Sequence, residues 1–313
     1  MCNTAELLTW NVVFAVEFLV IIAGNIITII VFWKLRFVLK RTYYLLINLT
    51  IADLTVGLGV VKIVTSNMLK LETTEDTRWA KFIAMDVFSG TASLTSLLLV
   101  AVERFYAIVF PFRHRILTKR IYMKCIAGVW MTSVLITAIT LMPDFFFNSG
   151  LAGISRWTLA SFTIFCLIVI CCLYTTIWVF ARKENPGIPR DKREQNKRLA
   201  KTLFIITVLT LIAWIPLAVA IVFPHDVTRH GDCVIPSALF AGLFLQLANS
   251  ALNPAVYCYR MPEFTKTLKQ DVLRCRSGNT KANAQSVIGR SSTDLPEFHS
   301  VANLPEGPVI KLS

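Results

Sequence analysis

Residues 10–33 read WNVVFAVEFLVIIAGNIITIIVFW, a run in which Glu17 is the single ionisable side chain. An α-helix needs about 20 predominantly apolar residues to cross a bilayer, because its backbone polar groups can be satisfied only within the helix itself. This run is long enough and apolar enough to meet both conditions. It predicts a membrane-spanning helix.

Six further runs of similar length and character follow along the chain. They cover residues 43–64, 82–110, 121–142, 157–180, 203–223 and 234–257. The composition agrees with them: of 313 residues, 55% are hydrophobic and only 16% are charged. A soluble domain has about a quarter of its residues charged and could not bury so much apolar surface in one core. We therefore expect an all-α fold, a bundle of seven transmembrane helices over residues 10–258.

The lysines and arginines between the spans predict how the bundle is oriented. The connections after the first, third and fifth spans carry seventeen of them, whereas the N-terminus and the other three connections carry five. Basic residues accumulate on the cytosolic side of membrane proteins. Residues 1–9 are therefore expected outside the cell, and the C-terminus inside. The same distribution explains the net charge of +13 without any nucleic-acid partner.

The residues after the seventh span divide into two predicted segments. Residues 259–276 place Phe264, Leu268 and Val272 on one helical face with basic residues beside them, which predicts a short amphipathic helix on the membrane lipids. Cys275 at its end is a candidate for palmitoylation, with a plain thiol as the alternative. Residues 277–313 are polar and predict a disordered cytoplasmic tail.

Several charged groups stand inside the predicted spans. A charged side chain at bilayer depth costs roughly 2.5–3.5 kcal/mol on insertion scales, so each needs a structural or functional reason. These groups are Glu17, Asp53, Lys62, Asp86, Glu103 and Arg104.

Short motifs accompany these charges in a fixed order along the spans. They are Gly24-Asn25, Leu49–Asp53, Glu103-Arg104-Phe105, Trp130, Tyr174, Ala213–Pro216 and Asn253–Tyr257. Each motif is weak by itself, but their order, one on each span, resembles the rhodopsin-like (class A) family of G-protein-coupled receptors. The resemblance implies a signal-transducing receptor of the plasma membrane, not an enzyme and without an organic cofactor. Such a receptor binds an extracellular ligand in the outer half of the bundle and activates a heterotrimeric G protein.

The resemblance also assigns a set of residues to activation and G-protein coupling. Glu103 holds Arg104 in the resting receptor, and activation releases the arginine to meet the G protein; a purely structural ion pair is the alternative. Pro216 and Pro254 remove backbone hydrogen bonds and are expected to kink their helices. The remaining members are the apolar knob Phe112, the packing switch Trp214, the supporting tyrosines Tyr174 and Tyr257, and Asn253.

A sodium site is implied in the centre of the bundle. Asp53, Ser93, Asn249, Ser250 and Asn253 match the family's sodium-binding positions. A buried carboxylate among hydroxyl and amide oxygens suits a small hard cation. The resemblance implies that allosteric sodium would favour the resting state. A protonated aspartate in a hydrogen-bond network is the alternative.

The chain departs from most of the family at several positions. Trp79 stands where a cysteine usually ties the top of helix 3 to the second outer loop, and Cys166 replaces a helix 5 proline. Both changes resemble the branch of melanocortin, cannabinoid and lysophospholipid receptors. Cys2 and Cys233 are candidates for a different outer disulfide.

A further departure bears on signalling. Asn196 replaces the helix 6 acid that usually holds the arginine, which leads to the hypothesis of basal signalling. Ser286, Ser291, Ser292 and Thr293 are candidate sites for a receptor kinase, with arrestin as the partner that follows.

The sequence is compatible with more than one class of ligand. Asp86 holds the position of the amine-binding aspartate in biogenic amine receptors, which favours a small cationic amine or a peptide, with Trp214 below it. An internal ion pair with Lys62, for which Glu17 would compete, and proton sensing are the alternatives for Asp86. An apolar site with Lys62 equally suits a lipid or lysophospholipid. A transporter is a remote alternative, because the seven spans show no repeated halves.

Overall fold

The structure is a computed structural model that describes the backbone of residues 4–39, 42–69, 75–146, 152–182, 204–205, 208–219 and 237–270. Side chains near several helix ends, including that of Lys62, are outside the described part. The chain divides into two units, Met1–Thr265 and Lys266–Ser313.

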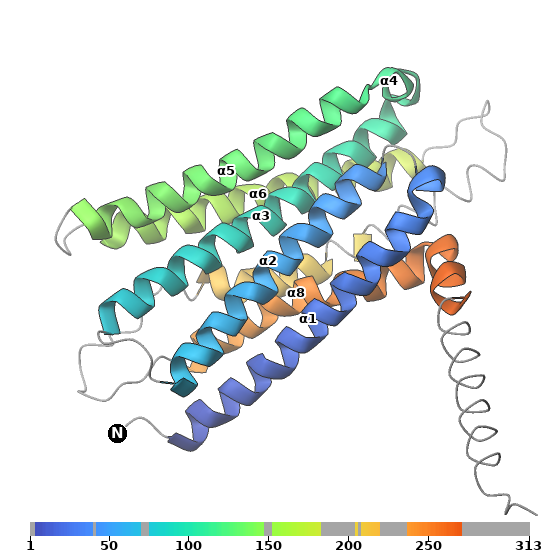
Figure 1. The fold of residues 1–313 in the computed structure, drawn as a ribbon. Helices are drawn as coiled ribbons and strands as arrows, with labels where there is room; N and C mark the ends of the chain where they lie inside the picture. Colours follow the sequence, from blue (N-terminus) through green and yellow to red (C-terminus); the bar gives the residue numbers. More distant parts are fainter. Residues whose placement is uncertain are drawn as a thin grey trace, which may run out of the picture. The chain divides into compact units, whose positions relative to one another are not determined.

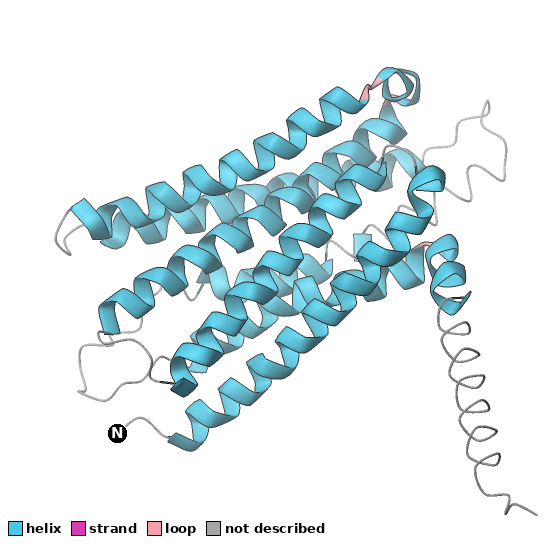
Figure 2. Cartoon of the chain, in the orientation of Figure 1, coloured by secondary structure: helices cyan, strands magenta, loops and turns pink. Residues whose placement is uncertain are grey.

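The described chain is helical throughout its regular structure, with no strand (Figure 2). Its long helices are α1 (Thr4–Leu39), α2 (Thr42–Leu69), α3 (Glu75–Val109), α5 (Lys119–Phe146), α6 (Ala152–Arg182) and α8 (Ser237–Arg260) (Figure 1). Residues 208–219 are also helical, within the predicted sixth span. The all-α prediction is confirmed, and each predicted span contains a helix, although the sixth is described only over residues 204–205 and 208–219. Among the described residues, four helices are long and apolar enough to cross a membrane and two shorter segments are apolar.

Two short helical pieces complete the described chain. The helix α4 (Pro111–Ile116) follows α3 directly and was not expected from the sequence. Helix α8 ends at Arg260, and residues 262–270 form the helical start of the predicted surface helix. Cys275 and the tail lie outside the described residues.

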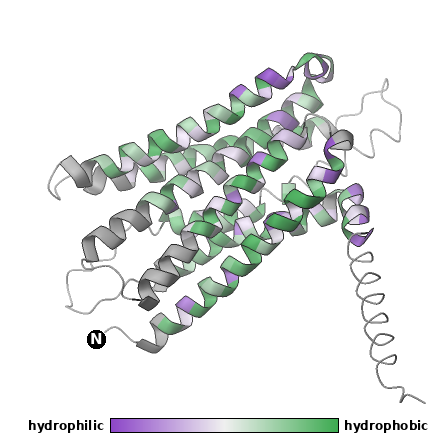
Figure 3. Cartoon of the chain, viewed as in Figure 1, coloured by the Kyte–Doolittle hydropathy of each residue, from purple (hydrophilic) through white to green (hydrophobic). Residues whose placement is uncertain are grey.

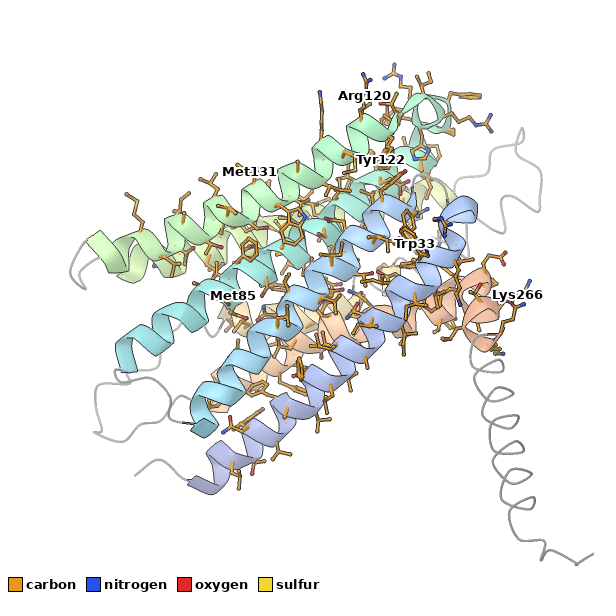
Figure 4. All side chains as sticks on the ribbon, viewed as in Figure 1. Trp33, Met85, Arg120, Tyr122, Met131 and Lys266 are labelled. Carbon is orange, nitrogen blue, oxygen red and sulfur yellow. The ribbon has the colours of Figure 1, made fainter. Side chains whose placement is uncertain are left out.

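Apolar side chains lie on both the inside and the outside of the bundle. One buried cluster joins α2, α3, α5 and α6 with residues of the 208–219 segment, and includes Leu49, Leu94, Ile170 and Trp214. Many large apolar side chains point outward instead, such as Met131 with 68% of its surface exposed (Figures 3 and 4). An outer face of this kind is what lipid-facing helices require.

Helix α3 is the centre of the packing. It lies against α2, α5, α6 and α4, while α1 packs against α2 and α8. Polar contacts reinforce these pairs: the Asn48 amide donates to Ser96 Oγ at 2.8 Å, and Trp130 Nε1 donates to Asn48 Oδ1 at 3.0 Å. These bonds tie α2, α3 and α5 together in a medium that offers no competing water.

Candidate functional site

The carboxylate of Asp53 on α2 is the most enclosed charged group described. Its residue is 0% exposed, and Ser93 Oγ and Ser250 Oγ each donate to its Oδ1 at 2.8 Å. Asn253 Nδ2 donates to Oδ2 at 2.6 Å. Asn249 is buried one helical turn before Asn253, and its Nδ2 has no hydrogen-bond partner among the described residues. The structure thus joins α2, α3 and α8 at Asp53.

The same residues fit a small hard cation by their chemistry. One carboxylate, two hydroxyl oxygens and amide oxygens are the ligands that such ions prefer. The serine hydroxyls can rotate and present a lone pair in place of a hydrogen. The three donors also reach both oxygens of the carboxylate without any cation, and sodium binding and a protonated Asp53 both stay predictions.

A second polar cluster lies in the half of the bundle that holds the N-terminus. Asp86 on α3 is half-buried, and the side-chain amide of Gln246 on α8 hydrogen-bonds its carboxylate. Gln246 reaches α3 because Gly90 is there: a Cβ at that position would lie 2.7 Å from Gln246 Nε2 and 3.4 Å from the Trp214 ring. Asp86, Gln246 and Trp214 therefore gather around Gly90. Figure 4 marks the place on α3 by the neighbouring Met85.

This second cluster contains groups without partners. Gln246 is 4% exposed and Trp214 is buried, yet Gln246 Oε1 and Trp214 Nε1 have no hydrogen-bond partner among the described residues. A buried polar atom left in this way costs roughly 1–3 kcal/mol. The cluster offers one carboxylate, one carbonyl acceptor and one N–H donor to an additional molecule.

The structure describes the side chains of only some of the predicted partners of Asp86. Lys62 lies on α2, but its side chain is outside the described residues, so an ion pair with Asp86 stays a prediction. Glu17 is buried on α1, and within the described residues neither of its carboxylate oxygens has a hydrogen-bond partner. Trp79, Asn196, Cys2 and Cys233 also lie outside the described side chains.

The opposite end of the bundle contains the Glu103–Arg104 pair. Arg104 Nε lies 3.2 Å from Glu103 Oε2, and the arginine side chain is 28% exposed while that of Glu103 is buried. The ion pair predicted from sequence is present. The second carboxylate oxygen, Oε1, lies 3.0 Å from Nε2 of His114 on α4, and Tyr122 Oη on α5 lies 3.1 Å from the same nitrogen.

The other predicted coupling residues occupy distinct places. Phe112 on α4 is 80% exposed. Tyr174 is buried in the core beside α3, and the ring of Tyr257 packs 5.1 Å from Phe32 and 6.0 Å from Phe264. Pro254 lies inside α8, and Pro216 lies inside the 208–219 helix. Tyr257 thus packs toward α1 in this structure.

Comparison with known proteins agrees with this arrangement. The sequence model described as "7 transmembrane receptor (rhodopsin family)" matches residues 24–257, well over half of the chain. The chain belongs to the rhodopsin family of seven-transmembrane receptors. As a member of that family it is a multi-pass membrane protein and a G-protein-coupled receptor.

Individual receptors are similar over most of their length. Adenosine receptor A3 of Canis lupus familiaris is 26% identical over 298 residues, covering 85% of this chain and 92% of that protein. Lysophosphatidic acid receptor 3 of Homo sapiens is 29% identical over 272 residues, covering 80% and 76%. Lysophosphatidic acid receptor 1-B of Xenopus laevis is 25% identical over 322 residues, covering 95% and 86%.

Two residues of these sites were missed from sequence. Gln246 is a long polar side chain inside an apolar helix, which is itself a signal for a functional position. His114 lies outside every span, and nothing in its local sequence shows that it would meet Glu103. Only the three-dimensional structure shows that Glu103 is the partner of His114.

Proposed function

We propose that this receptor binds an extracellular ligand carrying a protonated amine at Asp86 and passes the signal to a cytosolic G protein through Arg104. The N-terminus would lie outside the cell, so that the Asp86 cluster faces the extracellular side. A peptide with a basic side chain or a free amino end belongs to the same chemical class as a small amine.

The Asp86 cluster is the observation that carries this proposal. Among the described residues, the half-buried Asp86 carboxylate is paired with a neutral amide and with no cation, so its negative charge when ionised has no counter-charge. A ligand ammonium neutralises that charge, and its further N–H groups can donate to Gln246 Oε1. The indole of Trp214 belongs to the same cluster, since its ring lies 3.4 Å from a Cβ built on Gly90. The Trp214 ring therefore lies where it would contact a bound ligand and respond to it.

A lipid ligand is the second candidate. It is supported by the relatives named lysophosphatidic acid receptors. Those proteins are named for a lipid with an anionic head, whereas Asp86 would repel such a group unless Lys62 offset it. The relative named adenosine receptor A3 supports a neutral ligand as a further candidate.

The mechanism we infer is a shift between two populated states. In the resting state Glu103 holds Arg104 and Tyr257 packs on Phe32, as the contacts of this structure have them. A ligand that prefers the active state would move the helix containing Trp214 and Pro216 outward and free Arg104 for the G protein. Pro216 supplies the weak point, because it removes one backbone hydrogen bond.

Sodium would oppose that shift if it binds among Asp53, Ser93, Asn249, Ser250 and Asn253. A bound cation there would supply one positive charge that holds α2, α3 and α8 together. Asp53 would be the charged ligand, and the hydroxyl and amide groups would supply neutral oxygens. We also propose that a receptor kinase and arrestin act on the tail. The receptor would further show basal signalling, that is, signalling without a ligand.

The test is a ligand screen with matched carboxylate variants. Cells expressing the receptor receive a panel of biogenic amines, basic peptides, lysophosphatidic acid and adenosine, read by sensors for each class of heterotrimeric G protein. We expect an amine or basic peptide to activate, and Asp86→Asn to lower its potency by about 100-fold or more, as loss of a buried charge partner costs ~3 kcal/mol or more. Glu17→Gln removes a buried carboxylate of α1 and should leave the potency within about threefold.

Two outcomes would contradict the proposal. Full potency of the amine on Asp86→Asn would remove Asp86 from recognition. Activation by lysophosphatidic acid alone, unchanged in Asp86→Asn, would establish the lipid candidate instead.

A further inference from the structure

Gln246 is a polar side chain in the packed interior of the membrane domain. It is 4% exposed, and its neighbours on α8, Leu243 and Leu247, belong to a buried apolar cluster. A long amide in such surroundings costs free energy unless both its nitrogen and its oxygen are hydrogen-bonded. Among the described residues, only one of these two atoms has a partner.

Gly90 determines which end of the amide meets α3. A Cβ built on Gly90 would lie 2.7 Å from Gln246 Nε2 and 4.0 Å from Gln246 Cδ. The amide therefore points its nitrogen at α3 and has its oxygen on the far side. Asp86 precedes Gly90 by one helical turn on the same face of α3, and its carboxylate is hydrogen-bonded to the amide. An ionised carboxylate can only accept, so Nε2 is the donor.

The oxygen end of the same amide is left without a partner. Gln246 Oε1 is buried, and no described group donates a hydrogen bond to it. A carbonyl oxygen only accepts, so an N–H or O–H group of an added molecule is needed to satisfy it. Because Nε2 and Oε1 belong to one amide, Oε1 lies close to the carboxylate that Nε2 contacts. A single cationic group can therefore reach both Asp86 and Oε1.

Organic cations differ in how many N–H donors they bring to such a pair of acceptors. A primary ammonium has three, a secondary ammonium two, a tertiary ammonium one and a quaternary ammonium none. Asp86 takes one donor as a charge-assisted hydrogen bond. Primary and secondary ammonium and guanidinium groups keep a donor for Gln246 Oε1. Tertiary and quaternary groups place alkyl carbons against this oxygen and leave it without a hydrogen bond.

We propose that Gln246 is a specificity-determining residue that selects cations with at least two N–H groups and rejects tertiary and quaternary ammonium ions. The proposal rests on the proposed function, because it requires that Asp86 binds the cation of the ligand. A hydrogen bond to a charged group changes an equilibrium by about tenfold or more, which sets the size of the expected selectivity.

The contact between Asp86 and Gln246 is tested first, in purified receptor without any ligand. Gln246→Met keeps the length of the side chain and removes the amide, and Asp86→Leu removes the acceptor. Thermal unfolding is measured for both single variants and for the double variant. We expect the shifts to be non-additive by about 2 °C or more, because residues in contact are energetically coupled. Additive shifts would overturn the contact on which the selectivity depends.

The selectivity is tested with one homologous series of probes. They are phenethylamine and its N-methyl, N,N-dimethyl and N,N,N-trimethyl derivatives, and their dissociation constants come from the rise in unfolding temperature at up to about 10 mM probe. The N-methyl and N,N-dimethyl compounds are the decisive pair, because both keep an N–H for Asp86 and only the first has another for Gln246. We expect the N-methyl compound to bind the natural chain about tenfold more tightly, and Gln246→Met to reduce the difference to within about threefold.

Gly90→Ala is a second variant, which leaves both polar side chains in the chain. Its Cβ would displace Gln246 Nε2, the end of a flexible side chain, so the selectivity should fall as it does in Gln246→Met. Gly59→Ala on α2 is the matched control. Its Cβ would lie 3.9 Å from Ser89 Oγ and 4.0 Å from Met85 Cβ, which are ordinary contacts with the same helix α3. Gly59→Ala should keep the selectivity of the natural chain.

The possible failures of this test separate the selectivity from the proposed function. Equal binding of the N-methyl and N,N-dimethyl compounds to the natural chain would overturn the selectivity and leave Asp86 as an ammonium site. A tenfold difference that persists in Gln246→Met would assign the selectivity to other residues. Binding of none of the four amines would contradict the proposed function itself, and the selectivity would fall with it.

Discussion

At the residue scale, Asp53 shows how the bundle accommodates a carboxyl group at its centre. An unpaired carboxylate in an apolar medium is very costly, and hydrogen bonds offset that cost only in part. Three donors from α3 and α8 reach its two oxygens. A small cation at the same place would complete the compensation and add stability to the resting arrangement.

This compensation predicts a sodium-specific gain in thermal stability. A ligand at ten times its dissociation constant stabilises the folded state by ~1.4 kcal/mol, on the order of 3–5 °C for a domain of this size. We expect NaCl to raise the unfolding temperature of the purified receptor by this amount relative to KCl at equal ionic strength. Asp53→Asn should abolish the difference between the two salts.

Glu17→Gln is the matched control for Asp53→Asn, because it also removes a buried carboxylate from the transmembrane region. Its sodium increment should equal that of the natural chain. An increment that survives in Asp53→Asn would place any sodium effect elsewhere.

Residue identity alone predicted part of these sites. Asp53 and its partners stand in short motifs whose spacing indicates which helix each one occupies, and the structure brings Asp53, Ser93, Ser250 and Asn253 into contact. Gln246 and His114 belong to no such motif. Their roles follow from Gly90 leaving room on α3 and from α4 folding back onto Glu103, which are properties of packing.

At the element scale, glycines set how closely the helices approach. A Cβ on Gly242 of α8 would lie 3.1 Å from Leu217 Cα and 3.2 Å from Leu217 N. These are backbone atoms of the helix that contains Trp214 and Pro216, and they cannot move aside as a side-chain end can. The contact between α8 and the 208–219 helix therefore depends on the missing side chain.

We accordingly predict that Gly242→Ala destabilises the receptor by ~1–2 kcal/mol, the usual range for overpacking. Gly128→Ala on α5 is the matched control, since a Cβ there meets nothing within 4 Å. It should raise stability by ~0.5–1 kcal/mol through helix propensity. Thermal unfolding of the two purified variants measures both effects, and equal shifts would contradict the packing argument.

Helix positions were predictable from sequence, whereas helix ends were not. Hydropathy marks the part of a helix that lies in hydrocarbon, so residues 10–33 were predicted where α1 runs from Thr4 to Leu39. Hydropathy does not indicate where a helix ends, because a helix can continue beyond the membrane surface. The six residues of α4 are also too few for a periodic pattern, and their conformation depends on contacts with α3 and α5.

At the scale of the whole molecule, the two ends of the bundle differ in charge. The end that contains α4 and the start of α5 (Figure 1) carries five basic residues, all of them exposed. They are Arg113, Arg115, Lys119, Arg120 and Lys124. Positive residues favour the cytosolic side, and the acidic clusters of Asp53 and Asp86 do not compete with them because acids contribute little to orientation.

We predict that this charged end fixes the topology with the N-terminus outside. An epitope tag placed before Met1 should stain on intact cells, and one placed after Ser313 should stain only after permeabilisation. The five basic residues near α4 and α5 are part of the seventeen that produce this orientation, so replacing those five with glutamine should leave some molecules inverted. The matched control replaces the five lysines and arginines in the connections after the second, fourth and sixth spans. This replacement should leave the orientation unchanged. Staining of the C-terminal tag on intact cells expressing the natural sequence would contradict the topology and, with it, the assignment of Asp86 to an extracellular ligand.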